Sequence, residues 1–131
     1  MYIEHQPNGH FLGGAYGYGT ARDWARFGLL HQRGGVWIDG TRILPEGWTE
    51  YSATPTHTNE GYAAHFWRSP GHDPKLYYSS GFRNQNVFIF PDQELVIARF
   101  AMPPLAYVFW DTGAFLDDML ACLTTNSTRA D

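Results

Sequence analysis

The sequence has little positive charge, one lysine and one cysteine. Lysine and arginine together number 9 among 131 residues, against 13 acidic residues, and the net charge is -4. The composition therefore argues against a DNA or RNA partner, because nucleic-acid binding usually requires a basic patch. Cys122 has no second cysteine to pair with, so the fold does not depend on an oxidising compartment. We expect Cys122 to be a small buried residue near the end of a helix.

Long apolar runs are also missing. No stretch approaches the ~20 residues that a membrane-spanning helix needs, which predicts neither an integral membrane segment nor a membrane partner. Residues 1–14 lack the cationic head and apolar core of a secretory signal. These residues predict no export signal and leave the compartment open.

Apolar and aromatic side chains, in contrast, are abundant. Hydrophobic residues make up 44% of the chain and aromatic residues 17%, which is typical of a folded protein with a large core. The length and the absence of repeats or linkers predict one domain, 1–131. Only the tail, 124–131, is expected to fray.

Helix signals occur at three places. Thr20 and Asp23 form a capping-box pattern, and apolar residues then recur at helical spacing until Gly34-Gly35, which predicts a helix. Pro45 predicts a short helix through about Tyr51. A last helix is expected after residues 103–104, with Asp117 and Asp118 on its solvated face.

Strand signals dominate the second half. Residues 76–80, 85–90 and 95–101 are rich in aromatic and β-branched side chains and predict three antiparallel strands, with a hairpin loop at 91–94. Residues 62–68 are compatible with a further strand. Asp39-Gly40 predicts a hairpin over 36–44 with a type I′ turn. The expected fold is α+β, an antiparallel sheet of about three to five strands with flanking helices.

Three segments, taken in order, carry a family pattern. Residues 20–28 have the sequence T-A-R-D-W-A-R-F-G after a glycine-rich loop, residues 35–48 have G-V-W-I-D-G-T-R-I-L-P-E-G-W, and residues 80–99 run from Ser80-Gly81 to Arg99. Together they resemble the C-terminal part of the serine β-lactamase and penicillin-binding-protein-like family, especially its class C-like branch of esterases and 6-aminohexanoate-dimer hydrolases. The resemblance implies a partial β-lactamase/transpeptidase-like fold.

The resemblance also implies a set of cleft residues. The family's third motif, often Lys-Thr-Gly or His-x-Gly, aligns with Ser79-Ser80-Gly81, so Ser79 replaces the usual cation and Ser80 the hydroxyl residue. Gly81 would let a substrate backbone approach the strand, and the Phe82 amide would be the second oxyanion donor. Gln85 completes this vestigial cleft. The next pair, Arg83-Asn84, stands where many relatives have two glycines.

The nucleophile motif of the family, Ser-x-x-Lys, is missing. The serines are at positions 52, 69, 79, 80 and 127, and none has a lysine three residues later. Since nucleophilic catalysis needs a hydroxyl beside a base, we expect a truncated serine-hydrolase segment that is catalytically incompetent alone. It would contribute the third-motif strand of an ester- or amide-hydrolysing cleft, without cofactor or metal, and would need an N-terminal half.

A different class of function stays open, a non-catalytic binding or self-association module. In the full family, N-terminal strands pair beside the last strand of the sheet, so residues 95–101 would form an exposed edge here. Dimerisation through this edge, or by helix packing across a two-fold axis, is therefore expected. Binding of a small ester or amide ligand is also compatible with the cleft wall.

Other site interpretations are weaker. Ser80 with a histidine and an aspartate could build an unrelated triad, because triads are defined by geometry. His57, His65 and His72 match no common zinc spacing and indicate surface loops. The glycines at 13–19 favour a packing turn over a phosphate cradle. A larger set of aromatics favours a core over a ligand groove: Tyr77, Tyr78, Phe88, Phe90, Phe100, Phe109 and Trp110.

Overall fold

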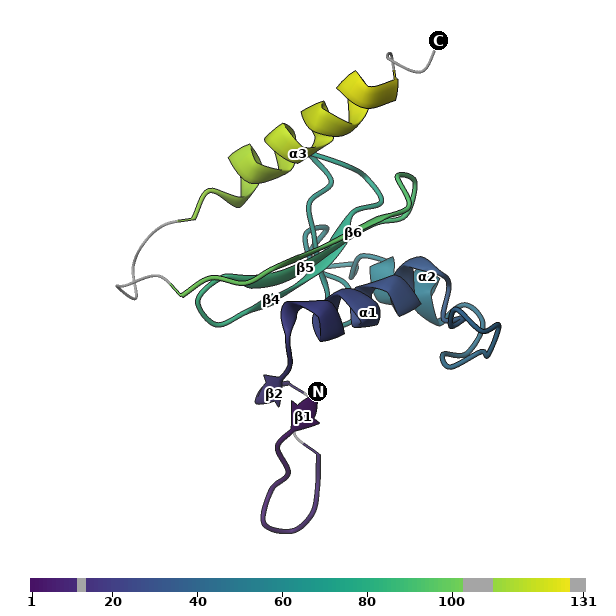
Figure 1. Cartoon of the computed structure of the whole chain (residues 1–131), viewed down its shortest axis with the longest axis vertical. Helices are drawn as coiled ribbons and strands as arrows, with labels where there is room; N and C mark the ends of the chain where they lie inside the picture. Colours follow the sequence, from purple (N-terminus) through teal and green to yellow (C-terminus); the bar gives the residue numbers. More distant parts are fainter. Residues whose placement is uncertain (12–13, 103–109, 128–131) are drawn as a thin grey trace.

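A computed structural model describes residues 1–11, 14–102 and 110–127 of the chain. Within these residues the fold is α+β, as predicted, with a four-stranded antiparallel sheet between helices (Figure 1). In chain order the elements are β1 (Tyr2–Ile3), β2 (Gly17–Tyr18), α1 (Ala21–Gln32), α2 (Trp48–Ala53), β3 (Trp67–Arg68), β4 (Tyr77–Gly81), β5 (Gln85–Phe90), β6 (Leu95–Arg99) and α3 (Thr112–Ser127).

The main sheet has the order β3-β4-β5-β6, and every neighbouring pair is antiparallel. The three strands predicted for the second half are confirmed to within two residues, with their hairpin loop at 91–94. Of the weaker expectation at 62–68, only the two residues of β3 are a strand. β3 and β6 form the two edges of the sheet.

Helices cover both faces of this sheet (Figure 1). On one face α1 lies close to β5 and β6, and a Cβ at Gly28 would stand 2.6 Å from a methyl carbon of Val96 and 2.8 Å from one of Val87. On the other face Leu116 of α3 joins Leu76, Phe88 and Phe90 in a fully buried cluster. The sheet therefore separates two small apolar cores.

The predicted aromatic core is confirmed only in part. Tyr77, Phe88 and Phe90 are buried, whereas Tyr78 and Trp110 are half-buried. Phe100 is 38% exposed, because it follows the last residue of the edge strand. Phe109 lies outside the described residues.

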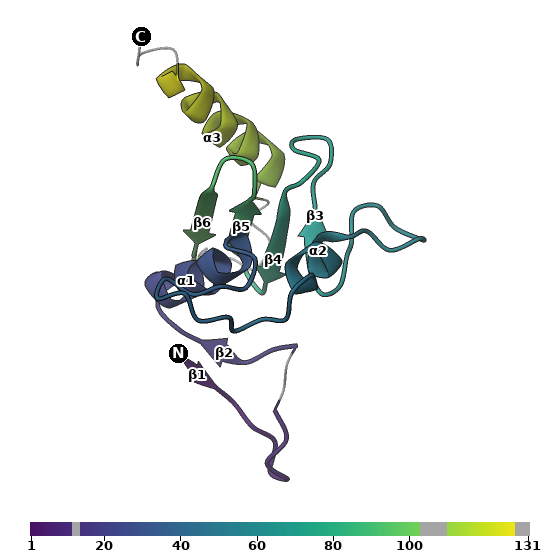
Figure 2. The same ribbon diagram turned by 90° about the vertical axis from the view of Figure 1, so that its right-hand side faces the viewer.

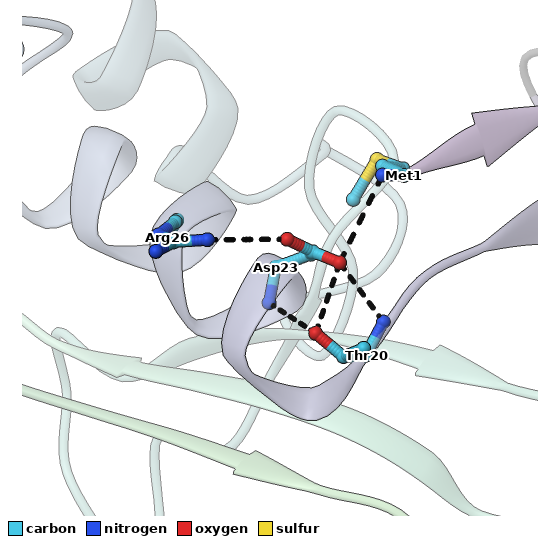
Figure 3. Close-up of polar contacts among 4 residues, drawn as sticks. All are labelled: Met1, Thr20, Asp23 and Arg26. Atoms are coloured by element: carbon cyan, nitrogen blue, oxygen red, sulfur yellow. Dashed lines mark hydrogen bonds and ion pairs between the residues drawn. The ribbon is translucent and has the colours of Figure 1, made fainter.

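The cap of α1 forms as the sequence predicts (Figure 3). The amide of Asp23 donates to Thr20 Oγ1 at 3.2 Å, and the amide of Thr20 donates to Asp23 Oδ2 at 3.1 Å. Arg26 and the amino group of Met1 also lie near this carboxylate. The hydrogen bonds from Thr20 lower the pKa of Asp23. The acid therefore stabilises the helix start in its charged form.

The glycine-rich segment before α1 packs closely against Trp24 of that helix, and its strand β2 pairs with β1. A Cβ at Gly17 would stand 3.1 Å from the Trp24 ring, and one at Gly19 would stand 3.3 Å from it. This agrees with the predicted packing turn. Strands β1 and β2 then form a two-stranded arm that projects beyond α1 (Figure 2).

The hairpin predicted over 36–44 is wrong in its turn. Only one bridge, Val36 to Arg42, forms there. The Trp37 carbonyl accepts the Gly40 N–H, and the Trp37 N–H donates to the Thr41 carbonyl. Gly40 has φ +87° but Asp39 is not left-handed, so this is not a type I′ turn. The Asp39 carboxylate instead accepts the Thr41 amide at 2.9 Å.

Three boundaries also differ. α2 begins at Trp48, because the left-handed Gly47 interrupts the backbone after Pro45. α3 continues to Ser127, so residues 124–127 of the tail that is expected to fray are part of this helix, while 128–131 lie outside the described residues. Cys122 is exposed, contrary to the expected burial, because the last turns of α3 extend past the sheet (Figure 2).

Candidate functional site

The predicted cleft residues lie at one end of the main sheet, on β4 and the turn after it. Ser79 pairs with Val87, on the face covered by α1, while Ser80 pairs with Asn86. Successive strand residues point to opposite faces. The two serines therefore cannot line the same face of the sheet.

Gly81 and Phe82 are open to solvent. A Cβ at Gly81 would meet only Gln85, at 3.6 Å, which is an ordinary contact distance. The fold itself therefore does not require glycine at this position. Phe82 is 81% exposed, and the Arg83 guanidinium lies 5.4 Å from the centre of its ring.

The turn between β4 and β5 is left-handed at two consecutive residues. Arg83 and Asn84 each have φ +60°. Asparagine tolerates this region better than most residues, whereas arginine is strained there by an amount on the order of 1 kcal/mol.

Side chains of the neighbouring strands hold this turn in place. The Asn84 carbonyl accepts from Arg99 Nη1 at 2.8 Å and from Asn86 Nδ2 at 3.0 Å. The Arg99 guanidinium also stacks on Trp110, 3.4 Å from the ring centre. The strained conformation is thus fixed by β5, β6 and the segment that leads into α3.

Gln85, the fifth predicted cleft residue, has a structural contact. Its amide group donates to the Ala101 carbonyl and accepts the Ala101 N–H at 3.2 Å. The side chain therefore extends the ladder between β5 and β6 beyond its last backbone pair. This pairing directs the Gln85 side chain toward β6.

Within the part of the chain that the structure describes, the two serines of β4 have no base beside them. In the described part of the chain, no histidine, lysine or carboxylate is hydrogen-bonded to Ser79 or Ser80, so the alternative triad on Ser80 does not form there. Burial raises the pKa of Tyr77 and of Tyr78. Both tyrosines on this strand therefore stay protonated at neutral pH.

His31 is a buried histidine on the α1 side of the sheet. Its ring lies 4.8 Å from that of Phe27 and 5.0 Å from that of Phe66, and Nδ1 has no hydrogen-bond partner among the described residues. Burial lowers the pKa of His31 to about 4. The side chain is a neutral part of the apolar core at physiological pH.

One cluster escaped sequence reasoning. Ser69 Oγ lies 2.8 Å from His72 Nδ1, and His72 Nε2 lies 3.6 Å from Asp117 Oδ1. The Pro-Gly pair between the serine and the histidine is a turn signal that could have placed these two together. Nothing local could have added Asp117, because it comes from α3.

The other histidines agree with the surface-loop interpretation. His57 and His65 are exposed, and no group of histidine, cysteine or acidic residues within the described ranges could hold a metal ion. A shallow hollow of about 300 Å³ lies beside His57, between α2 and the following loop. None of the predicted cleft residues lines it.

Comparison with the models of protein families gives no match, and comparison with curated proteins gives none either. Across the described residues, no helix has both the length and the apolar character needed to cross a membrane.

Proposed function

We propose that this chain is the C-terminal segment of a β-lactamase-like serine hydrolase. It contributes the third-motif strand, Ser79-Ser80-Gly81, to a cleft that hydrolyses esters or amides. One observation carries the proposal: Arg83 and Asn84 both take left-handed backbone at the two positions where many members of the resembled family have glycine. Glycine is the residue expected wherever that conformation is required.

Gly81 supports the same assignment. A glycine that the fold does not need, next to an exposed strand end, is explained if another molecule must approach the backbone there. The neighbouring Phe82 amide is suited to stabilise an oxyanion, a role that requires only a well-placed N–H.

The β4 serines are catalytically incompetent in the chain alone. The only lysine, Lys75, forms an ion pair with Asp92 at 2.7 Å, in the loop between β5 and β6. Because Lys75 is held by this ion pair, it does not serve as the base for the β4 serines. The nucleophile and base must come from a further segment with Ser-x-x-Lys and Tyr-x-Asn motifs.

A fusion experiment tests this function. The chain is joined to the N-terminal half of a class C-like esterase, and hydrolysis of a chromogenic ester and a chromogenic cephalosporin is measured. We expect the fusion, but not the chain alone, to turn over the cephalosporin, and we expect the fusion to hydrolyse the ester faster than the chain alone. Gly81→Val should abolish both gains. The control is Gly14→Val, since that glycine also has open space around it.

Two results would contradict the proposal. One is an inactive fusion that is nevertheless folded by circular dichroism. The other is ester hydrolysis by the chain alone that Ser80→Ala abolishes.

A self-association module is the second candidate, and the β6 edge favours it. The strand has the sequence Leu-Val-Ile-Ala-Arg, and its only charge, Arg99, is occupied by Asn84 and Trp110. Edge strands usually carry charges or prolines that prevent pairing. A second copy offers the same edge, so antiparallel pairing of β6 with its copy about a two-fold axis covers the β6 edge of each chain. A monomer by light scattering at tens of micromolar would count against it.

A further inference from the structure

Ser69, His72 and Asp117 come together where the loop before β4 meets α3. The amides of His72 and Asp73 both donate to the Ser69 carbonyl, at 3.0 and 3.1 Å. This turn places the Ser69 hydroxyl and the His72 ring on the same side, with Oγ 2.8 Å from Nδ1. That distance is within the range of a nucleophile paired with its base.

Asp73 fixes the turn to the body of the protein. Its buried carboxylate accepts the backbone amides of Lys75 and Leu76 at 2.7 and 3.2 Å, and the Gln93 side chain at 2.8 Å. The loop is thus tied to the start of β4 and to the loop after β5. A catalytic pair needs such support to keep its geometry.

The first turns of α3 lie against the other side of the histidine ring. Asp117 Oδ1 lies 3.6 Å from Nε2, and a Cβ at Gly113 would stand 3.2 Å from the same nitrogen. The His72 side chain is 27% exposed and the Asp117 side chain 70% exposed. The cluster is therefore accessible from solvent.

The chemistry follows from which ring nitrogen carries the hydrogen. A carboxylate beside Nε2 favours the tautomer with hydrogen on Nε2, which leaves Nδ1 to accept the Ser69 hydroxyl proton. The nitrogens are used in the opposite sense to the Ser-His-Asp triad of serine proteases, but the three roles are the same.

We propose that Ser69 is a reactive serine, with His72 as its base and Asp117 as a positioning residue, and that it takes small activated esters. Ser69 Oγ bonds to the ester carbonyl carbon while its proton passes to His72 Nδ1. The bond to the alcohol then breaks, and the proton leaves with the alcohol. Water attacks the acyl-serine in the same way and releases the acid. This site is separate from β4 and does not depend on the function proposed above.

A fluorophosphonate probe tests the site on the purified chain. Ser69 Oγ should bond to phosphorus, fluoride should leave, and the proton should go to His72. Intact-mass and peptide analysis should find one adduct, on Ser69, that is absent from Ser69→Ala and retained in Ser80→Ala. His72→Gln should slow labelling by about 100-fold or more, the usual contribution of a general base.

The neighbouring aspartates supply a matched pair for the positioning role. Asp117→Asn should slow labelling several-fold, whereas Asp118→Asn should leave it unchanged, since both side chains are exposed on α3 but only Asp117 approaches the ring. Circular dichroism confirms that each variant is folded. An unlabelled chain, an adduct on another serine, or a Ser69 rate indifferent to His72→Gln each overturns the proposal. An adduct on Ser80 would, in addition, count against the incompetence of the β4 serines.

Discussion

At the scale of single residues, burial sets the charge state of the side chains between α1 and the sheet. Tyr77 and His31 lie together there, with ring centres 6.4 Å apart. Burial raises the pKa of Tyr77 and lowers that of His31, so that both are neutral in the folded protein. Both shifts make folding sensitive to pH, and only that of His31 does so in the acid range.

The His31 shift predicts acid destabilisation. Its pKa falls from 6.5 to about 4 on folding, so between these values the unfolded chain binds a proton that the folded chain excludes. The contribution of His31 to the free energy of unfolding is therefore fully present above pH 6.5, and it decreases as the pH falls toward 4. By pH 5 the loss should be about 2 kcal/mol relative to pH 8.

Urea unfolding at the two pH values measures this loss. His31→Leu should remove most of the pH dependence, whereas His65→Leu, at an exposed histidine, should retain it. If wild type and His31→Leu lose equal stability on acidification, another group is responsible. Asp23, whose pKa is lowered from 3.8, acts in the same direction but only at lower pH.

At the scale of elements, Gly28 decides how closely α1 lies on the sheet. Alanine would raise the helix propensity of α1 by up to ~1 kcal/mol. Its Cβ, however, would overlap Val96 and Val87 at 2.6 and 2.8 Å, and overpacking of a core typically costs about 1–3 kcal/mol. We therefore expect Gly28→Ala to destabilise the protein by about 1–2 kcal/mol in urea unfolding.

A second substitution separates overlap from any other effect of the alanine. Val96→Ala removes the methyl carbon that would stand nearest, at 2.6 Å, so the double variant with Gly28→Ala should lose less stability than the sum of the two single changes. Additive losses, or a stabilising Gly28→Ala, would show that α1 is not held at this distance.

The elements with a local signal were the ones that the sequence predicted. The capping pair of α1 and the β-branched runs of β4, β5 and β6 act through neighbouring residues, so their positions agree with the structure. The turn at Asp39 was mistaken because its carboxylate binds the Thr41 amide, a competition that the Asp-Gly pattern does not reveal. The contact of His72 with Asp117 depends on where α3 packs, which no local pattern contains.

The candidate site divides in the same way. Its strand follows from local sequence, whereas the left-handed backbone at Arg83 and Asn84 was not predicted, because neither residue is a glycine. That Ser79 and Ser80 face opposite sides follows from strand alternation once β4 is placed. The pairing of the Gln85 side chain with the Ala101 backbone required the register of β6, which sequence alone left undetermined.

At the scale of the whole molecule, two helices protect the faces of the sheet and leave β6 at its edge (Figures 1 and 2). The apolar character of this edge continues beyond the strand, since Phe100 is 38% and Met102 85% exposed. Exposed apolar residues next to an unprotected edge favour association. They also offer positions that can be charged without disturbing either core.

The double variant Phe100→Glu/Met102→Glu tests the association through this edge. If two copies pair antiparallel along the whole of β6, residues 100 and 102 of one copy lie opposite Glu94 and Asp92 of the other. The added acids then repel these carboxylates across the interface, and the dimer should dissociate to monomer in light scattering at tens of micromolar. Phe82→Glu is the matched control, because Phe82 is 81% exposed but lies on the turn between β4 and β5. A dimer that survives the double variant, or that dissociates equally with Phe82→Glu, would place the interface elsewhere. Unchanged circular dichroism in all variants would attribute the effect to the interface, because these side chains contribute little to the buried clusters.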